Sequence, residues 1–496
     1  MKKFLCVVLS AALFALCAAV PSAAADEAPA EPPNTGAPPI IVVSGMNTFP
    51  MMLDAGAEGE KQVFPPENLN IFSMVFKILP AAFLSLLTGD WNRLADRAIP
   101  IVNDILGPIA CDGNGDSVNG ITVRKFTRSL AYNDDYKIFE DGGSNEFAIT
   151  RRAIELYGPE RTYYYNYNWR LDPVGHAREL RELVITAKAE TGSEKVVLVP
   201  CSMGGAQVMA YLAEYGGGDI DMLVSMSSVF CGTYIASDVL SMRIAIERGN
   251  ILRLIYGMDN RFLSCFVKAL DKIGIVDGLL KIGQNIISSI KDRVFDECLG
   301  DIFATMPGLW ALVQPEDYEY AKSLTLDPEK HAVLIDRIDC FYDNVSVKRG
   351  EILKAAEAEG MRIAIFSHYG ISSPPVFERA DAQSDGIVET CFSSGRAVVA
   401  PMGEKLPAGY AQQVTGCGHS HLSPDGIIDA STCMFPEYTW FFKNVAHVGA
   451  VYGGDQNDCL FKLIEFEGQP TIHSDGLYPQ FMEDAGNHKL QVSSGK

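Results

Sequence analysis

A chain of 496 residues has room for two or three average domains, or for one enzyme domain that carries insertions. Apolar residues make up 48% of the chain and charged residues 21%, which is typical of a globular protein with a large core. Acidic residues outnumber basic ones 62 to 41, and no basic run stands out. This balance excludes the electrostatic footprint of a nucleic-acid-binding protein and gives no support for docking to anionic membranes.

The first 25 residues have the pattern of a secretory signal peptide. Two lysines precede the apolar run FLCVVLSAALFALCAAV, and an A-x-A cleavage site follows at residues 23–25. The apolar run is too short for a stable membrane span. We therefore expect a secreted or extracytoplasmic protein, exported in the bacterial manner, with an extended linker over 26–37. Lipid modification of Cys17 is the alternative, although Leu16 is large for such a processing site.

The folded part is predicted to begin with PPIIVVSGM, residues 38–46, a strand rich in β-branched residues. Residues 70–110 follow as an apolar stretch in helix-length pieces that proline interrupts. Core packing is the first interpretation of this stretch, and a flap that touches lipid is the second.

Strands and helices alternate between residues 163 and 230. YYYNYNWR is an aromatic strand, and Asp172 and Pro173 then supply the N-cap and the first-turn proline of a helix. The strand VVLVP, a second helix AQVMAYLAEY and the strand DMLVSMSSVF follow. This alternation predicts an α/β fold, a mostly parallel sheet flanked by helices with right-handed crossovers.

The turn between VVLVP and its helix carries the most specific motif of the chain. In VVLVPCSMGG, residues 196–205, Ser202 stands where a nucleophile elbow of the α/β-hydrolases lifts its serine above the sheet. Gly204 and Gly205 provide the small residues that this tight turn needs. Pro200 replaces the first glycine of G-x-S-x-G, so the match is partial, and a plain glycine turn is the alternative.

Beyond residue 234 the pattern changes. Residues 235–350 are amphipathic helices, which we interpret as a helical cap or lid inserted between a first core segment, 38–234, and a second, 351–470. Strands return with MRIAIFSHYG and TWFFKNVAH. Residues 471–496 have little pattern and are predicted to be a C-terminal tail.

A serine nucleophile needs a histidine base, and the base needs a carboxylate to orient it. Asp385 in SDGIVET follows a late strand and is the candidate acid. His447 follows the last convincing strand and is the candidate base. His419 and His421 in GHSHLSPDG are the alternative bases, or members of a metal or structural cluster with nearby aspartates.

The remaining requirements concern the oxyanion and possible cofactors. The backbone N–H groups of Met203 and Met46 are predicted to form the oxyanion hole, one after the nucleophile and one after the first strand. DGNGDS, residues 112–117, spaces oxygens like a calcium loop but lacks the sixth-position glycine and the closing glutamate. We expect a solvated turn there, and neither a metal nor a cofactor in the reaction.

These residues together resemble a distant member of the lecithin:cholesterol acyltransferase family, which includes lysosomal phospholipase and phospholipid:diacylglycerol acyltransferase. The likeness rests on PPIIVVSGM with a nearby Leu-Asp pair, on YNWRLDP, on CSMGG, and on SHYG ahead of SDGIV. It covers about half of the mature chain. The resemblance implies Ser202 as nucleophile, Asp385 as acid, a late histidine as base and the turn at Met46 with Met203 as oxyanion hole.

The chain departs from the family at three places. Asn168 replaces an aspartate, Cys201 stands where a histidine usually precedes the serine, and His447 lies farther from the acid than the family's histidine does. We therefore expect an exported serine esterase or lipase that hydrolyses acylglycerol or phospholipid esters through an acyl-enzyme. A lipid acyltransferase and a non-catalytic lipid- or surface-binding protein on the same fold are the alternatives.

Overall fold

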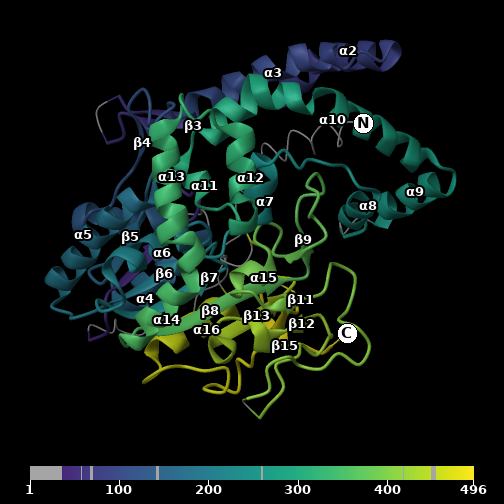
Figure 1. Cartoon of the computed structure of the whole chain (residues 1–496). Coiled ribbons are helices and arrows are strands. Elements are labelled where there is room, and N and C mark those ends of the chain that lie inside the picture. The colour runs from purple at the N-terminus through teal and green to yellow at the C-terminus, as the bar shows by residue number, and fades with distance from the viewer. Residues whose placement is uncertain are drawn as a thin grey trace.

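The computed structural model describes residues 36–56, 59–67, 71–140, 145–257, 261–416, 418–447, 454–486 and 488–495. The predicted signal peptide and most of the predicted linker lie outside these ranges. The described chain is built on one large sheet with helices against it, and further helices extend from one end (Figure 1). The predicted α/β class is confirmed.

The main sheet has eight strands, all parallel except the last, which runs antiparallel to its neighbour. From one edge to the other they are β15 (Leu490–Val492), β14 (Phe481–Asp484), β13 (Thr439–Lys443), β8 (Arg362–Tyr369), β7 (Ile220–Met226), β6 (Val196–Pro200), β1 (Ile40–Val43) and β5 (Thr162–Tyr165). The inner strands β1 and β6 of this sheet are buried at every residue. Their sequences are therefore apolar throughout and do not alternate between apolar and polar residues.

Alternate residues of these strands pack against helices on opposite faces. One face carries Ile41, Leu198 and Ile363 and is covered by α5 (Pro173–Thr191), α6 (Gly204–Tyr215) and α14 (Arg349–Ala358). The other carries Val197 and Phe366 and is covered by α4 (Asn145–Tyr157) and α16 (Asp455–Glu465). The sheet is thus the middle layer of three.

Local signals in the sequence agree with this arrangement. Asp172 caps α5 as predicted, since its carboxylate accepts a hydrogen bond from Val174 N–H at 2.9 Å, and Pro173 is the first helical residue. The predicted aromatic strand is shorter than expected. It ends at Tyr165, and the buried residues after it form the turn that leads to the α5 cap.

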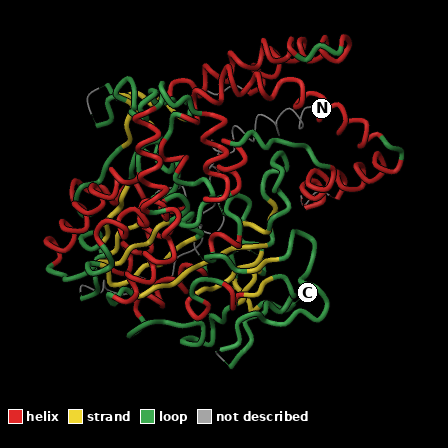
Figure 2. Tube along the Cα trace, viewed as in Figure 1, coloured by secondary structure: helices red, strands yellow, loops and turns green. Residues whose placement is uncertain are grey.

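Helices occupy much of the segment predicted as a cap. They are α7 (Tyr234–Leu240), α8 (Arg248–Gly257), α9 (Arg261–Lys272), α10 (Ile275–Val294), the π-helix η3 (Phe295–Ala304), α11 (Pro307–Trp310), α12 (Pro315–Thr325), α13 (Ala332–Asn344) and the 3₁₀ turn η4 (Ser346–Lys348). Helix α10 contacts α3 (Asn92–Leu106), and α3 contacts α2 (Ile71–Thr88). Together α2, α3, α9 and α10 form the helical end seen at the top of Figure 2.

Smaller elements lie between these layers. Three short sheets contain β2 (Met51–Leu53), β3 (Lys61–Phe64) and β4 (Ile121–Val123), then β9 (Ile371–Ser372) with β10 (Gln383–Ser384), and β11 (Val398–Val399) with β12 (Ile428–Asp429). The short helices are α15 (Thr390–Ser393), η1 (Gly107–Ile109), η2 (Tyr132–Phe139), η5 (Ala430–Thr432) and η6 (Pro436–Tyr438). Among the described residues, no helix combines the length and apolar character needed to cross a bilayer.

The structure corrects the prediction of a C-terminal tail over 471–496. β14 pairs in parallel with β13, and β15 pairs with β14, so this segment completes one edge of the main sheet. The reason for the discrepancy is that β14 reads FMED and β15 reads LQV. Neither short strand shows a sustained apolar run or a clear alternation, because only the first two residues of β14 are buried and no residue of β15 is.

Candidate active site

The turn after β6 has the strained geometry of a nucleophile elbow. Ser202 adopts a left-handed backbone with φ of 50°, which is costly for a residue other than glycine. Its neighbours hold it there. Ser202 N–H donates to the Met226 carbonyl at 3.3 Å, and the Ser202 carbonyl accepts from Val229 N–H at 2.7 Å. The serine is therefore fixed between β6 and the end of β7.

The two glycines after Ser202 are required by space. A Cβ on Gly204 would lie 2.7 Å from the Val43 carbonyl oxygen, and one on Gly205 would lie 2.8 Å from Ser228 Cβ. The turn therefore brings the start of α6 against the backbones that follow β1 and β7. Pro200 is compatible with this turn, because it is the last residue of β6 and the next ladder hydrogen bond is donated by Cys201 N–H.

The structure brings the three predicted triad side chains together. His447 Nε2 lies 2.9 Å from Ser202 Oγ, and His447 Nδ1 lies 2.8 Å from Asp385 Oδ2. The residues come from loops after β6, β8 and β13, at the carboxyl ends of parallel strands. Since a carboxylate only accepts, Nδ1 carries the imidazole proton and Nε2 is left to accept from the serine hydroxyl.

Asp385 is held in place from several sides. Its Oδ1 accepts the backbone N–H groups of Ile387 at 3.0 Å and Val388 at 2.8 Å. Its Oδ2 accepts from His447 and from the Ser227 hydroxyl. Burial of the carboxyl acts to raise its pKa, but the His447 charge and these hydrogen bonds outweigh burial, so the pKa of Asp385 is lowered. The group therefore stays ionised beside the imidazole.

A backbone contact sets the register between the acid and the base. His447 N–H donates to the Asp385 carbonyl oxygen at 2.8 Å, so the two loops meet through main chain as well as side chain. This contact explains how a histidine 62 positions after the acid reaches it. This long separation in sequence is one of the three departures from the family pattern. The chain covers it by running along β13, beside β8, back to the acid.

The alternative bases lie elsewhere. His419 Nε2 and His421 Nε2 face Glu437 Oε1 at 3.1 and 3.3 Å, near the start of β13, and His473 Nε2 faces the other oxygen of Glu437 at 3.6 Å. His447 follows the opposite end of that strand. Among the described residues, His447 is thus the histidine placed against Ser202.

The predicted oxyanion donors flank the serine. Met203 is buried directly after Ser202, at the first turn of α6. Met46 follows β1, and this turn lies against the elbow because Cys201 N–H donates to the Val43 carbonyl at 3.0 Å. Both positions agree with the roles expected for their N–H groups, which remain predictions.

Three polar residues near the triad were not predicted as part of the site. Ser227 has φ of 45° and donates to Asp385, but a serine after a strand gives no distinctive signal. Glu389 is buried, and burial raises its pKa to about 7. His368 is buried and has its pKa lowered by burial to about 4, and its Nε2 lies 2.5 Å from Gln456 Nε2.

The other metal candidates have self-contained turns. In the segment 112–117, the Asp112 carboxylate accepts from the N–H groups of Asn114 and Asp116, both at 2.9 Å. Asp116 in turn pairs with Arg337. The segment is thus a turn closed by its own side chains, and the expectation that it holds no metal remains a prediction. Asp425 accepts from the Ser423 hydroxyl and pairs with Lys443 of β13, whereas Asp429 accepts from the Ser431 hydroxyl and the Gln413 N–H; neither joins the histidine group.

Comparisons with known proteins add little to this geometry. No protein-family model matches the chain, and no curated protein matches it. Among solved structures, the crystal structure of the Tle4–Tli4 complex is similar with a TM-score of 0.32 and 11% identity, over 68% of this chain and 75% of that chain. A likeness this weak says nothing about activity.

Proposed function

We propose that the protein is a serine hydrolase of the α/β-hydrolase type that cleaves carboxylic esters. The observation that carries the proposal is the hydrogen-bonded series from Ser202 through His447 to Asp385, with its serine on a strained turn. In an enzyme of this kind the partners follow the serine in the order acid and then histidine, as they do here. The proposal includes distant membership of the lecithin:cholesterol acyltransferase family and export from the cell.

The geometry supports a two-step reaction. Ser202 Oγ attacks the ester carbonyl carbon while its proton passes to His447 Nε2, and Asp385 stabilises the imidazolium. The oxyanion of the tetrahedral intermediate would accept hydrogen bonds from the N–H groups of Met203 and Met46. His447 then gives its proton to the departing alcohol oxygen, which leaves an acyl-Ser202 ester. Water then attacks this ester while His447 takes its proton; the bond to Ser202 Oγ breaks as His447 returns the proton to that oxygen, which releases the carboxylic acid and restores the enzyme.

Helix α2 favours lipids as the source of the ester. Its large apolar side chains are exposed where a soluble protein normally buries them, with Phe76 71%, Phe83 60% and Leu87 66% accessible. Lys77 is the one charged residue of this 18-residue helix. Such a surface is suited to contact with an apolar phase, and acylglycerols and phospholipids present their esters at the boundary of one.

The test is covalent labelling combined with turnover. Wild-type protein should hydrolyse a p-nitrophenyl ester and react with a fluorophosphonate probe at Ser202, identified by mass spectrometry of the labelled peptide. Ser202→Ala should lose both signals. Ser323→Ala, which removes a hydroxyl that bonds only its own helix, should keep both. Folded wild-type protein that ignores both reagents would refute the proposal.

A second measurement defines the reaction. With a phospholipid or acylglycerol and a long-chain alcohol present, a hydrolase releases fatty acid, whereas a transferase forms the alcohol's ester. We expect fatty acid as the main product. Predominant ester formation would replace hydrolysis by acyl transfer without changing the role of Ser202.

A further inference from the structure

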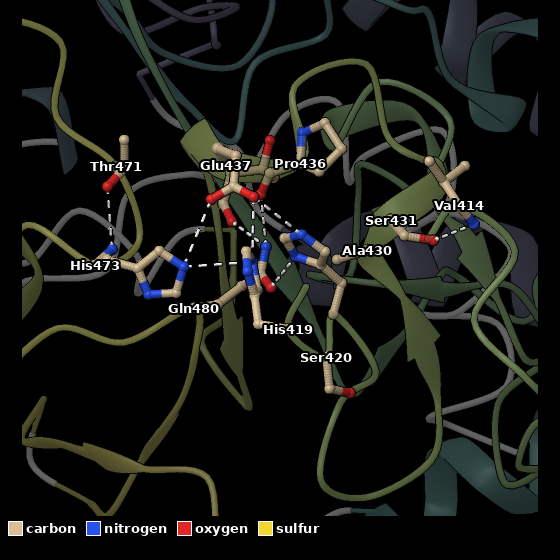
Figure 3. A network of polar contacts seen from close by, with 12 residues as sticks. Val414, His419, Ser420, Ala430, Ser431, Pro436, Glu437, Thr471, His473 and Gln480 are labelled. Carbon is tan, nitrogen blue, oxygen red and sulfur yellow. Dashed lines mark hydrogen bonds and ion pairs between the residues drawn. The ribbon is translucent and has the colours of Figure 1, made fainter. Parts of the chain in front are cut away.

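Three histidines and a glutamate converge near the start of β13. This is the end of the main sheet opposite to the one that carries the triad. His419 and His473 face the carboxylate of Glu437 (Figure 3), and His421 faces the same group. Glu437 belongs to η6, immediately before β13, whereas His447 follows the other end of this strand. The cluster is therefore separate from the active site.

The ligand atoms of His419, His421 and Glu437 all lie within 4.8 Å of one another, as the ligands of one metal ion must, and His473 faces part of this group. Two ligands bound to zinc at about 2.0–2.1 Å with a tetrahedral angle lie about 3.3–3.4 Å apart. Here the Nε2 atoms of His419 and His421 lie 3.1 and 3.3 Å from Glu437 Oε1, and those of His473 and His419 lie 3.3 Å apart. The Nε2 of His473 lies 3.6 Å from Glu437 Oε2.

The tautomer of His421 is fixed from outside the cluster. The side-chain amide N–H group of Gln480 donates to the carbonyls of Pro436 at 2.8 Å and Thr439 at 3.1 Å, so its Oε1 must face the imidazole. That oxygen lies 2.8 Å from His421 Nδ1, which therefore carries a proton. Such an outer partner is the usual way in which proteins orient a metal-binding histidine.

The inner nitrogen of His421 is then left without a conventional hydrogen bond. Its Nε2 is buried and has no hydrogen-bond partner in the described part of the chain, although Glu437 lies 3.3 Å away. In the neutral imidazole this atom is a lone pair aimed at a carboxylate, and the two repel. A cation between them removes the repulsion. Protonation of all three imidazoles would place three positive charges around one carboxylate, whereas one metal ion satisfies every group.

The surrounding backbone fixes the cluster in position. The Glu437 carbonyl accepts from Ile472 N–H at 2.9 Å, which holds the segment of His473 beside η6. His421 N–H donates to Gln412 Oε1 at 2.6 Å. The segment of His473 therefore meets η6 through a contact that does not involve an imidazole ring, and the loop of His421 is held by its own glutamine. His473 is exposed and leaves a path for an ion to enter.

We propose that His419, His421 and Glu437 bind one Zn²⁺ and that the exposed ring of His473 turns inward as the fourth ligand, which gives a closed structural site. Imidazole nitrogens with one carboxylate suit zinc, and four protein ligands leave no open position for a substrate. The ion would join the loop of His419 and His421, the start of β13 and the segment before β14. The ion would thus stabilise the part of the sheet around β13, the strand that leads to His447.

The experiment uses full-length protein that carries Ser202→Ala, so that its result does not depend on the proposed catalysis. The protein is stripped with dipicolinate, loaded with Zn²⁺, freed of excess metal and analysed for bound zinc, and its affinity is measured by competition with a chromophoric chelator. Co²⁺ is bound in parallel, because a tetrahedral site gives it strong visible absorption. We expect one zinc per chain, tetrahedral cobalt spectra and a melting temperature that rises on loading.

Variants locate the site. Glu437→Gln and His473→Gln should each weaken zinc binding by at least about 100-fold, the upper range of effects seen when even an outer partner is removed. His488→Asn is the matched control, since it removes an exposed histidine outside the cluster and asparagine tolerates its φ of 59°. It should bind zinc like the parent. Absence of bound zinc in the folded parent, or equal affinity in all three variants, would overturn the proposal.

Discussion

Replacement of Asp385 by asparagine tests how the site holds its proton. Asparagine has the same shape as aspartate, but one of its two oxygens becomes an NH₂ group. Two backbone N–H groups, those of Ile387 and Val388, point at the position of Oδ1. The amide oxygen must occupy that position, because an NH₂ there would face two donors. The NH₂ group is then placed at the position of Oδ2, against His447 Nδ1.

The orientation of the amide dictates the loss of activity. With a donor facing Nδ1, the imidazole must carry its proton on Nε2, and Nε2 can no longer accept the proton of Ser202. A wrong tautomer of this kind costs on the order of 10⁴-fold in turnover in serine hydrolases, which is about 5 kcal/mol of transition-state stabilisation. The Ser227 hydroxyl can turn to accept from the NH₂ group, so the fold should be retained.

The assay is kcat/KM on a p-nitrophenyl ester, together with the rate of fluorophosphonate labelling and the urea midpoint. Asp429→Asn is the matched control. This buried carboxylate also accepts two hydrogen bonds at each oxygen, from Ser431 at one and from Tyr410 and Gln413 at the other. The control should lose stability but keep its kcat/KM. A folded Asp385→Asn protein with activity within about tenfold of wild type would contradict the assigned proton positions.

Two other predictions concern stability. Burial raises the pKa of Glu389 from 4.5 to about 7, so its contribution to stability falls by about 3 kcal/mol as pH rises from the unfolded pKa to the folded one. Glu389→Gln should remove this fall, seen as a smaller difference in unfolding free energy between pH 5 and pH 8 than in wild type; an unchanged difference would refute it. Gly204→Ala should cost about 1–3 kcal/mol in thermal unfolding, because its Cβ would meet the carbonyls of Val43 and Ser44 at 2.7 and 2.8 Å. Gly175→Ala in α5, where no atom lies within 4 Å, is the control and should be neutral or stabilising.

The core of the fold was predictable because its signals are local. β6 is apolar at all five residues, and Asp172 with Pro173 marks the start of α5 within two positions. The elbow was predictable for the same reason, since the turn, the serine and the two glycines are contiguous. The Asp-Gly turn after a strand predicts Asp385. In the structure the carboxylate lies in this turn and accepts the two backbone N–H groups that follow it.

The rest depends on contacts between segments that are far apart in sequence. β14 joins the sheet by pairing with β13, and no residue pattern within β14 announces that pairing. The choice between His447 and the pair His419 and His421 was left open, because distance along the chain does not measure distance in space. The contact between the His447 N–H and the Asp385 carbonyl decides it.

The partners of each carboxylate distinguish the two histidine clusters chemically. Backbone and hydroxyl donors bind both oxygens of Asp385, and the carboxylate faces one imidazole. Its charge therefore orients that single ring. Glu437 faces three imidazoles, those of His419, His421 and His473. A carboxylate whose other lone pairs are taken by fixed donors acts on the neighbouring imidazole alone, by keeping the proton on the ring nitrogen that faces it. A carboxylate that faces several imidazoles offers a cation both charge and lone pairs, and the zinc proposed for Glu437 would thus lie at the opposite end of β13 from the triad.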